Sequence, residues 1–140
     1  MFNLKETLSS LDGFIDNEYL DKYCRLIELN TRTNSLAKRT NSHHIIPKAW
    51  FKINNKPINN DKINLVNLEY RNHVLAHYFL CLCIKDQLKY ANELALICLV
   101  NRKKLNSSDK RLVMNLPLYN NIYEDYKLKQ QNNYKLYGGK

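Results

Sequence analysis

The sequence predicts one α+β domain, mostly α-helical, in which two short antiparallel strands and one helix form the centre and other helices flank them. The chain has 140 residues, which is the size of a single ordinary domain. Apolar residues recur at helical spacing in several long segments, whereas only two short segments have the composition of strands. No internal repeat or domain boundary is evident, so residues 1–140 form one predicted unit.

The first predicted helix begins near Asn17, and Asp16 or Asn17 can cap it. Its apolar residues fall on one stripe at helical spacing and should be buried: Leu20, Tyr23, Cys24 and Ile27. Residues 30–42 are polar and have few apolar anchors, so they are predicted to form a loop. This loop leads into the first of two histidine pairs.

Two short strands are predicted next. The first is the run HHIIP, which Pro47 ends, and the second is NLVNLEY, which starts at Asn64. Residues 48–63 connect them and are too long for a tight hairpin turn, so we expect a loop. Its side chains Trp50, Phe51 and Ile53 should pack partly on the core.

Further helices follow the second strand. The segment from Arg71 to Ile84 has apolar residues on two sides and should lie between two layers, with His73 and His77 facing the strands. A helix from Gln87 to Val100 is predicted to bury Leu88, Ala91, Leu94, Ala95 and Cys98. Another helix, which Pro117 interrupts, can be capped by Ser107, Ser108 or Asp109.

Positive charge is concentrated in the last part of the chain. The whole sequence has 22 Lys and Arg against 13 Asp and Glu. Residues 101–140 alone hold nine basic and three acidic residues, a net charge of +6. Such a field attracts phosphates, so nucleic acid is the first partner to consider and an anionic membrane surface the second. Tyr119, Tyr123 and Tyr126 lie in the same region and are expected to face the core.

The sequence predicts a protein of the cytoplasm that does not enter the membrane. No apolar run approaches the roughly 20 residues needed to span a bilayer, and the amino terminus lacks the pattern of a signal peptide. The four cysteines are not spaced as a four-thiolate zinc site, and Cys81 and Cys83 lie in an apolar segment where we expect them buried as thiols. Both a monomer and a homodimer are compatible with the sequence.

The four histidines form two close pairs, His43–His44 and His73–His77. Two histidines four residues apart on a helix lie on one face and can share a divalent ion, although many such pairs bind no metal. Neighbours in a strand point to opposite faces, so only one of His43 and His44 can join that ion. The other would then be available as a general base on the substrate side.

Three segments in order, HHIIP, NLVNL and RNHVLAH, resemble the signature of the HNH endonucleases, also called His-Me finger or ββα-metal nucleases. The resemblance covers residues 42 to about 84, and the wider chain is similar to small stand-alone HNH proteins of low-GC bacteria and their phages. The loop from His44 to Asn64 is longer than usual and lacks the Gly-Gly often found there.

The resemblance implies a role for each matching residue. His43 would bind one divalent metal ion together with His73 and His77, and His44 would activate water as the catalytic base. Asn64 would complete the catalytic motif by a hydrogen bond across the long loop that holds the strand of His44. The products of DNA cleavage would carry 5′-phosphate and 3′-hydroxyl ends.

General chemistry indicates which ions the three histidines would bind and which residues are candidates for contact with the substrate. Three imidazoles favour Zn²⁺, Ni²⁺ or Co²⁺, whereas Mg²⁺ or Mn²⁺ could serve turnover once phosphate and water complete the shell. Lys48 and Arg71 lie near the motif and are candidates for contact with DNA phosphates. A further set of candidates is the basic run that follows the predicted helix from Gln87 to Val100: Arg102, Lys103 and Lys104.

Two other functions stay open at this point. The histidines could hold the fold of a non-catalytic, metal-stabilised DNA-binding module. The chain could also be a toxin-type HNH nuclease, but such a domain ends a longer chain, and Met1 at the first position ranks this alternative lower. Homing, restriction and phage-interference roles share the same chemistry, as do nicking and double-strand cutting.

Overall fold

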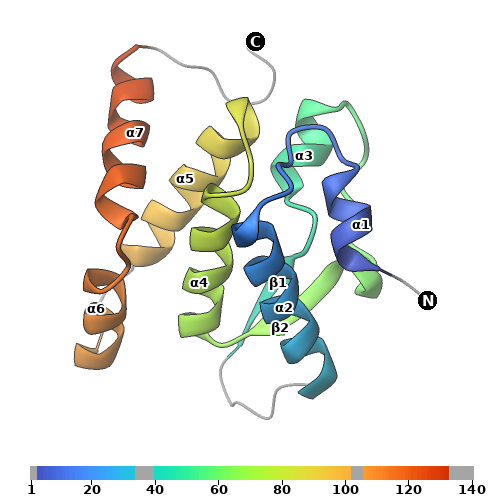
Figure 1. Cartoon of the computed structure of the whole chain (residues 1–140), viewed down its shortest axis with the longest axis horizontal. Coiled ribbons are helices and arrows are strands. Elements are labelled where there is room, and N and C mark those ends of the chain that lie inside the picture. Colours follow the sequence, from blue (N-terminus) through green and yellow to red (C-terminus); the bar gives the residue numbers. More distant parts are fainter. Residues whose placement is uncertain (1–2, 34–39, 102–105, 133–140) are drawn as a thin grey trace.

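The structure, a computed structural model, describes residues 3–33, 40–101 and 106–132. Along this part of the chain the elements are α1 (Leu4–Ser9), α2 (Glu18–Thr33), β1 (Asn41–His44), α3 (Lys48–Ile53), the short 3-10 helix η1 (Lys62–Asn64), β2 (Leu65–Leu68), α4 (Tyr70–Cys81), α5 (Asp86–Val100), α6 (Ser107–Met114) and α7 (Tyr119–Gln131). Figure 1 shows the helices surrounding one small sheet. The predicted class, mostly helical α+β with two antiparallel strands, is confirmed.

The sheet is formed by β1 and β2, which pair antiparallel with His43 opposite Val66 and His44 opposite Leu65. The strand β1 begins at Asn41 and ends at His44, so it lies earlier than the predicted run HHIIP. A single residue, Glu69, separates β2 from α4, and α4 packs against both strands. This short connection brings the histidines of α4 next to those of β1.

We predicted a loop between the two strands, but the structure has the helix α3 in this connection. Trp50 and Phe51 are buried in it, and the indole N–H of Trp50 donates to the backbone oxygen of Asp12 at 3.0 Å. Pro47 occupies the cap position, where its missing N–H costs nothing. A helix of six residues is too short to show a sequence period, and its stability comes from tertiary burial.

The helix α2 starts as predicted, because the side-chain oxygen of Asn17 accepts from the N–H groups of Tyr19 and Leu20. The stripe Leu20, Tyr23, Cys24 and Ile27 is buried, as expected. The helix continues to Thr33, however, so the prediction of a loop from residue 30 was wrong by one turn. Asn30 and Thr31 donate their side-chain hydrogen bonds to carbonyls one turn earlier and so remain helical.

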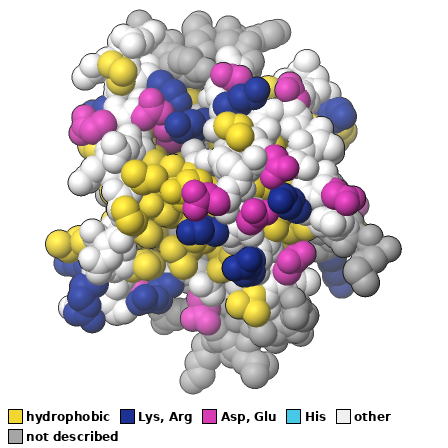
Figure 2. Space-filling view, in the orientation of Figure 1, with side chains coloured by type: hydrophobic (Ala, Val, Ile, Leu, Met, Phe, Trp, Pro, Cys, Tyr) yellow, Lys and Arg dark blue, Asp and Glu magenta, His cyan; other side chains and the backbone are white. Residues whose placement is uncertain are grey.

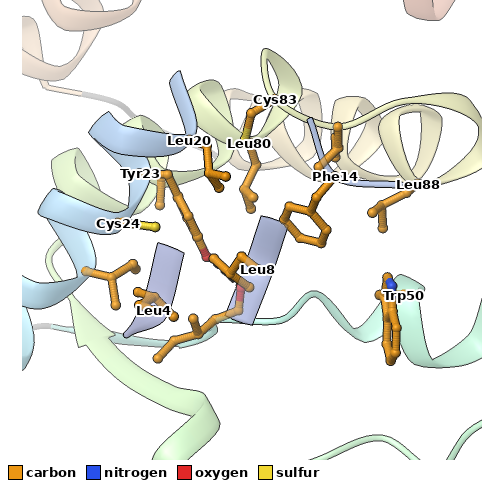
Figure 3. Close-up of a cluster of buried hydrophobic side chains, with 14 of the residues drawn as sticks. Leu4, Leu8, Phe14, Leu20, Tyr23, Cys24, Trp50, Leu80, Cys83 and Leu88 are labelled. Atoms are coloured by element: carbon orange, nitrogen blue, oxygen red, sulfur yellow. Dashed lines mark hydrogen bonds between the residues drawn. The ribbon is translucent and has the colours of Figure 1, made fainter. Parts of the chain in front are cut away.

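Most of the core lies between α1, α2, the sheet, α3 and α4. Figure 3 shows Tyr23 among the buried side chains Leu4, Leu8, Leu20 and Leu80. Cys81 and Cys83 are buried free thiols, as predicted. The helix α4 also packs on its other side against a second cluster, which includes residues of α5 and α7, so it does lie between two layers.

The helix α5 buries a different set of residues from the predicted one. It packs against α3, α4 and α7, so more than one side of it is covered. Leu88 is buried as expected, whereas Cys98 is exposed. Asn92 and Glu93 are buried instead, because each has polar partners inside the protein.

The carboxyl-terminal helices lie against α5 (Figure 1). The cap of α6 is Asn106, whose side chain accepts from the N–H of Asp109, and not one of the three predicted residues after it. Of the tyrosines predicted to face the core, Tyr126 is buried and stacks on Tyr90, while Tyr119 is half-buried and Tyr123 is 37% exposed. Apolar side chains gather on the face shown in Figure 2 amid charges of both signs.

Candidate metal centre

Three of the four histidines meet in the structure: His43 from β1, and His73 and His77 from α4. One nitrogen of each lies within 4.8 Å of a nitrogen of the other two. The ring centroids are 5.3 Å apart for His43 and His73, 5.0 Å for His43 and His77, and 4.9 Å for His73 and His77. These spacings are small enough for one ion to contact all three rings.

The local structure explains this convergence. His73 and His77 are one helical turn apart, and their Nε2 atoms lie 3.2 Å from one another. In the strand β1, His43 points inward and is 3% exposed, whereas His44 is half-buried and does not belong to the cluster. The alternation of a strand therefore separates the two neighbours, as expected.

The other ring nitrogen of two of these histidines is held by a neighbouring helix. Nε2 of His43 lies 2.8 Å from the hydroxyl of Tyr23 in α2. Nδ1 of His77 lies 2.7 Å from the side-chain oxygen of Asn92 in α5. One nitrogen of each ring is thus held by a neighbouring helix, and the other nitrogen of His77, Nε2, faces His73.

Burial disfavours the charged form of two of these imidazoles, those of His43 and His77. The pKa of His43 is well below its usual range, first because the ring is buried and then because His77, His73 and His44 are close. The pKa of His77 is also lowered by burial, and the hydrogen bond with Asn92 opposes this only in part. Neutral imidazole is the form that binds a metal ion, so these two lowered pKa values favour the form of His43 and His77 that can act as a ligand.

A cleft of about 400 Å³ opens beside the cluster. It lies between the end of β1, the start of α3 and one side of α5. The residues that line it are Ser42, His43, His44, Pro47, Lys48, Ala49, His73, His77, Leu88, Ala91, Asn92 and Ala95. No histidine is visible on the face drawn in Figure 2.

His44 borders this cleft with its ring fixed from the other side. Its Nε2 lies 2.7 Å from the side-chain oxygen of Asn60, which can only accept a hydrogen bond. Nε2 of His44 therefore carries the proton, and Nδ1 keeps its lone pair. A neutral imidazole with one nitrogen anchored in this way has the arrangement of a general base.

Asn64 is buried at the start of β2 and makes the hydrogen bonds expected across the long loop. Its side-chain oxygen accepts from the N–H of Ile46 at 2.8 Å, and its side-chain nitrogen donates to the backbone oxygen of Asn59 at 2.9 Å. The backbone oxygen of Asn64 accepts from the N–H of Ile45 at 2.8 Å. Asn64 therefore ties the residues after His44 to the second strand.

The candidate DNA-binding residues do not all gather at the cleft. Lys48 is exposed and lines it, so its ammonium group can reach a bound phosphate. Arg71, at the start of α4, is also exposed, but its guanidinium donates to the hydroxyl of Ser108 in α6 and does not line the cleft. Arg102, Lys103 and Lys104 lie outside the described residues.

Tyr23, Asn60 and Asn92 contact the histidines but were not identified as site residues from the sequence. Tyr23 was predicted only as a member of a buried apolar stripe. The sequence did not indicate that its hydroxyl would contact His43. Asn92 offered a usable signal, because it stands four residues after Leu88 on a face predicted to be apolar, where a buried amide needs partners. Asn60 lies in an asparagine-rich loop that offered no such signal.

No known protein supplies an independent identification. The chain matches none of the models of known protein families, none of the curated proteins and none of the solved structures with which it was compared. Among the helices of residues 3–33, 40–101 and 106–132, none combines the length and apolar character that crossing a membrane requires.

Proposed function

We propose that this protein is a metal-dependent DNA endonuclease of the HNH type, in which β1, β2 and α4 form the ββα-metal core. His43, His73 and His77 would hold one divalent ion. The observation that carries the proposal is the convergence of these three imidazoles beside a cleft that His44 borders without joining them. In this proposal three of the four histidines bind the ion, and the fourth, His44, acts as the base.

The residues present fit an ion that prefers nitrogen ligands. The cluster contains imidazoles and no carboxylate or thiolate, which favours Zn²⁺, Ni²⁺ or Co²⁺ in binding. Mg²⁺ or Mn²⁺ can serve turnover if phosphate oxygens and water fill the remaining positions. A bound divalent ion supplies Lewis-acid stabilisation of the negative charge that develops on the phosphate and on the leaving oxygen.

His44 performs the proton transfer in this proposal. Its Nδ1 accepts a proton from a water molecule whose oxygen attacks the scissile phosphorus, while the bond between phosphorus and the 3′ oxygen breaks and that oxygen takes a proton from solvent. Asn60 accepts the hydrogen bond from Nε2 and stabilises the imidazolium that results. Asn64 keeps the residues after His44 in place during this step. Lys48 binds a phosphate of the substrate at the mouth of the cleft.

DNA is the substrate that charge and motif favour together. The net charge of +9 provides attraction to a phosphate backbone, and residues 101–140 contribute most of it. The products would carry 5′-phosphate and 3′-hydroxyl ends. The site of action would be the cytoplasm of a bacterial or phage-infected cell.

Cleavage of supercoiled plasmid DNA tests the proposal. Protein freed of metal by a chelator should be inactive, and activity should return with one of Mg²⁺, Mn²⁺, Zn²⁺, Ni²⁺ or Co²⁺. His44→Ala should lower the rate by about 10²-fold or more, since general-base catalysis contributes about that much. The control Asn67→Ala, at an exposed position of β2, should cleave like the wild type.

Two results would contradict the proposal. DNA binding with no cleavage under any of these ions would indicate the metal-stabilised binding module instead. Cleavage that His44→Ala leaves at the wild-type rate would remove His44 from the mechanism.

A further inference from the structure

We propose that Tyr23 and Asn92 are positioning residues that fix the tautomers of His43 and His77, so that each ring presents an unprotonated nitrogen to the same ion. The inference rests on the proposed metal site, but it concerns two residues of α2 and α5, which flank the two strands and α4. It follows from the hydrogen bonds that each of the two residues makes with a second partner.

Tyr23 has one hydroxyl hydrogen and two close partners. Its oxygen lies 2.8 Å from the backbone oxygen of Ile45 and 2.8 Å from Nε2 of His43. The carbonyl of Ile45 can only accept, so the tyrosine hydrogen must point to it. Nε2 of His43 must then be the donor to the tyrosine oxygen, and Nδ1 of His43 is the nitrogen left with a lone pair for an ion shared with His73 and His77.

The hydroxyl hydrogen of Tyr23 has one favoured direction, toward the backbone oxygen of Ile45. Its side chain is 0% exposed, so no water competes for its hydroxyl hydrogen. Turning its hydrogen toward His43 would leave two oxygens, its own and that of Ile45, facing one another without a proton between them. Such a buried acceptor pair is unfavourable, because both oxygens would lack a hydrogen-bond donor, and this favours the arrangement in which Tyr23 donates to Ile45.

Asn92 fixes the second ring by the same reasoning. Its side-chain nitrogen donates to the backbone oxygen of His77 at 2.8 Å, and it also lies 3.1 Å from the sulfur of Cys81. The amide is therefore oriented with its oxygen toward Nδ1 of His77, at 2.7 Å. An amide oxygen only accepts, so Nδ1 carries the proton and Nε2 faces His73 as a lone pair.

The two residues thus fix different tautomers. Tyr23 holds His43 with its proton on Nε2, and Asn92 holds His77 with its proton on Nδ1. A free imidazole exchanges between both forms, and only one of them presents its lone pair to the ion. Fixing the correct form before the ion arrives raises affinity, because no fraction of the protein has to change tautomer on binding. Partners of this kind typically contribute 10- to 100-fold in metal affinity.

The direct test is ¹⁵N NMR of the histidine rings in metal-free protein. The wild type should show His43 protonated at Nε2 and His77 at Nδ1. In Tyr23→Phe, which keeps the ring in the core and removes only the hydroxyl, His43 should lose its single tautomer while His77 keeps its own. Asn92→Leu should release His77 alone, and Asn92→Asp, which retains an accepting oxygen, should restore the Nδ1–H form.

Titration of the same variants with Zn²⁺ and Co²⁺ gives the second readout. Tyr23→Phe and Asn92→Leu should each bind 10- to 100-fold more weakly than the wild type, and Asn92→Asp should bind within a few-fold of it. The matched control is Tyr78→Phe. Tyr78 is another buried tyrosine, whose hydroxyl accepts from the N–H of Leu118 and touches no histidine, so its removal should leave affinity unchanged.

The outcomes separate this inference from the proposed nuclease. Unchanged tautomers in Tyr23→Phe and Asn92→Leu, or equal losses of affinity in these variants and in Tyr78→Phe, would overturn the positioning role even if the wild type cleaves DNA. Fixed tautomers in a wild type that binds no divalent ion would instead remove the metal site and with it the nuclease.

Discussion

The side chain of Asn64 is hydrogen-bonded to both backbone polar groups of Ile46, a residue eighteen positions earlier in the chain. It accepts from the N–H of Ile46 at 2.8 Å and donates to the oxygen of Ile46 at 3.3 Å. A further donation to Asn59 holds the returning end of the loop. Asn64 therefore closes the whole connection between β1 and β2, and it fixes the backbone that follows His44.

Replacing Asn64 should accordingly affect both stability and catalysis. Asn64→Ala leaves buried backbone groups without partners, so the free energy of unfolding should fall by about 1–3 kcal/mol. The residual folded protein should cleave DNA more slowly, because His44 is less firmly placed. Denaturant unfolding and cleavage at saturating DNA measure the two effects. Asn121→Ala, at an exposed position of α7, serves as control, and equal stability of the two variants would contradict this role.

Asn60 should matter for the proton transfer and not for the ion. Asn60→Ala removes the acceptor at 2.7 Å from Nε2 of His44, so the ring can adopt either tautomer and the imidazolium loses a partner. We expect the single-turnover rate of cleavage to fall about 10-fold, a small part of the effect of losing the base. Affinity for Zn²⁺ should remain at the wild-type value. A loss of metal affinity equal to the loss of rate would place Asn60 in the metal site instead.

Glu93 predicts an unusual dependence of stability on pH. Burial, and a hydrogen bond with Asp125, raise its pKa to about 8, although Lys129 lies 3.2 Å away and opposes the shift. The folded protein therefore keeps a proton that the unfolded chain releases near its ordinary pKa. Because the folded state binds more protons between these two values, this group makes stability fall as pH rises toward 8.

The corresponding measurement is the free energy of unfolding of metal-free protein at pH 6.5 and at pH 8.5. The wild type should lose stability relative to Glu93→Gln over this interval, since the amide cannot ionise. Glu124→Gln, at an exposed position of α7, should follow the wild type at both pH values. If the free energy of unfolding changed equally with pH in all three proteins, Glu93 would already be ionised in the folded state.

Binding of DNA should depend on salt through the basic carboxyl-terminal region. If roughly four of its cations pair with phosphates, the logarithm of affinity should fall against the logarithm of salt concentration with a slope of about −3.6. Neutralising Arg102, Lys103 and Lys104 together should flatten this slope by up to about 3, with little effect on cleavage at saturating DNA. An unchanged slope would place the phosphate-binding surface on Arg32, Lys38, Arg39 and the loop from Lys48 to Lys62.

The sequence predicted the elements that have a clear period and missed those that depend on distant contacts. The stripe of α2 and the two sides of α4 follow from apolar spacing, and both are present. The helix α3 has six residues, and burial of Trp50 and Phe51 stabilises it, so no local pattern could reveal it. The burial of α5 was misjudged because one stripe was assumed where three other helices cover it.

The same distinction applies to the site. The spacing of His73 and His77 and the alternation of His43 and His44 are local, and their geometric consequences are present. Tyr23 contacts His43 across 20 positions of the chain, and Asn92 contacts His77 across 15. Such partners are selected by tertiary packing, and a single sequence does not state which buried polar side chains will meet.

Calorimetric titration of metal-free protein with Zn²⁺ tests the central claim, that three histidines form one metal site and the fourth does not. We predict one ion per chain for the wild type and for His44→Ala, with similar affinity. His43→Ala, His73→Ala and His77→Ala should each bind at least about 10²-fold more weakly, because each loses one of three ligands. Equal affinity in the wild type and in these three variants would show that the ion binds elsewhere and would contradict the account.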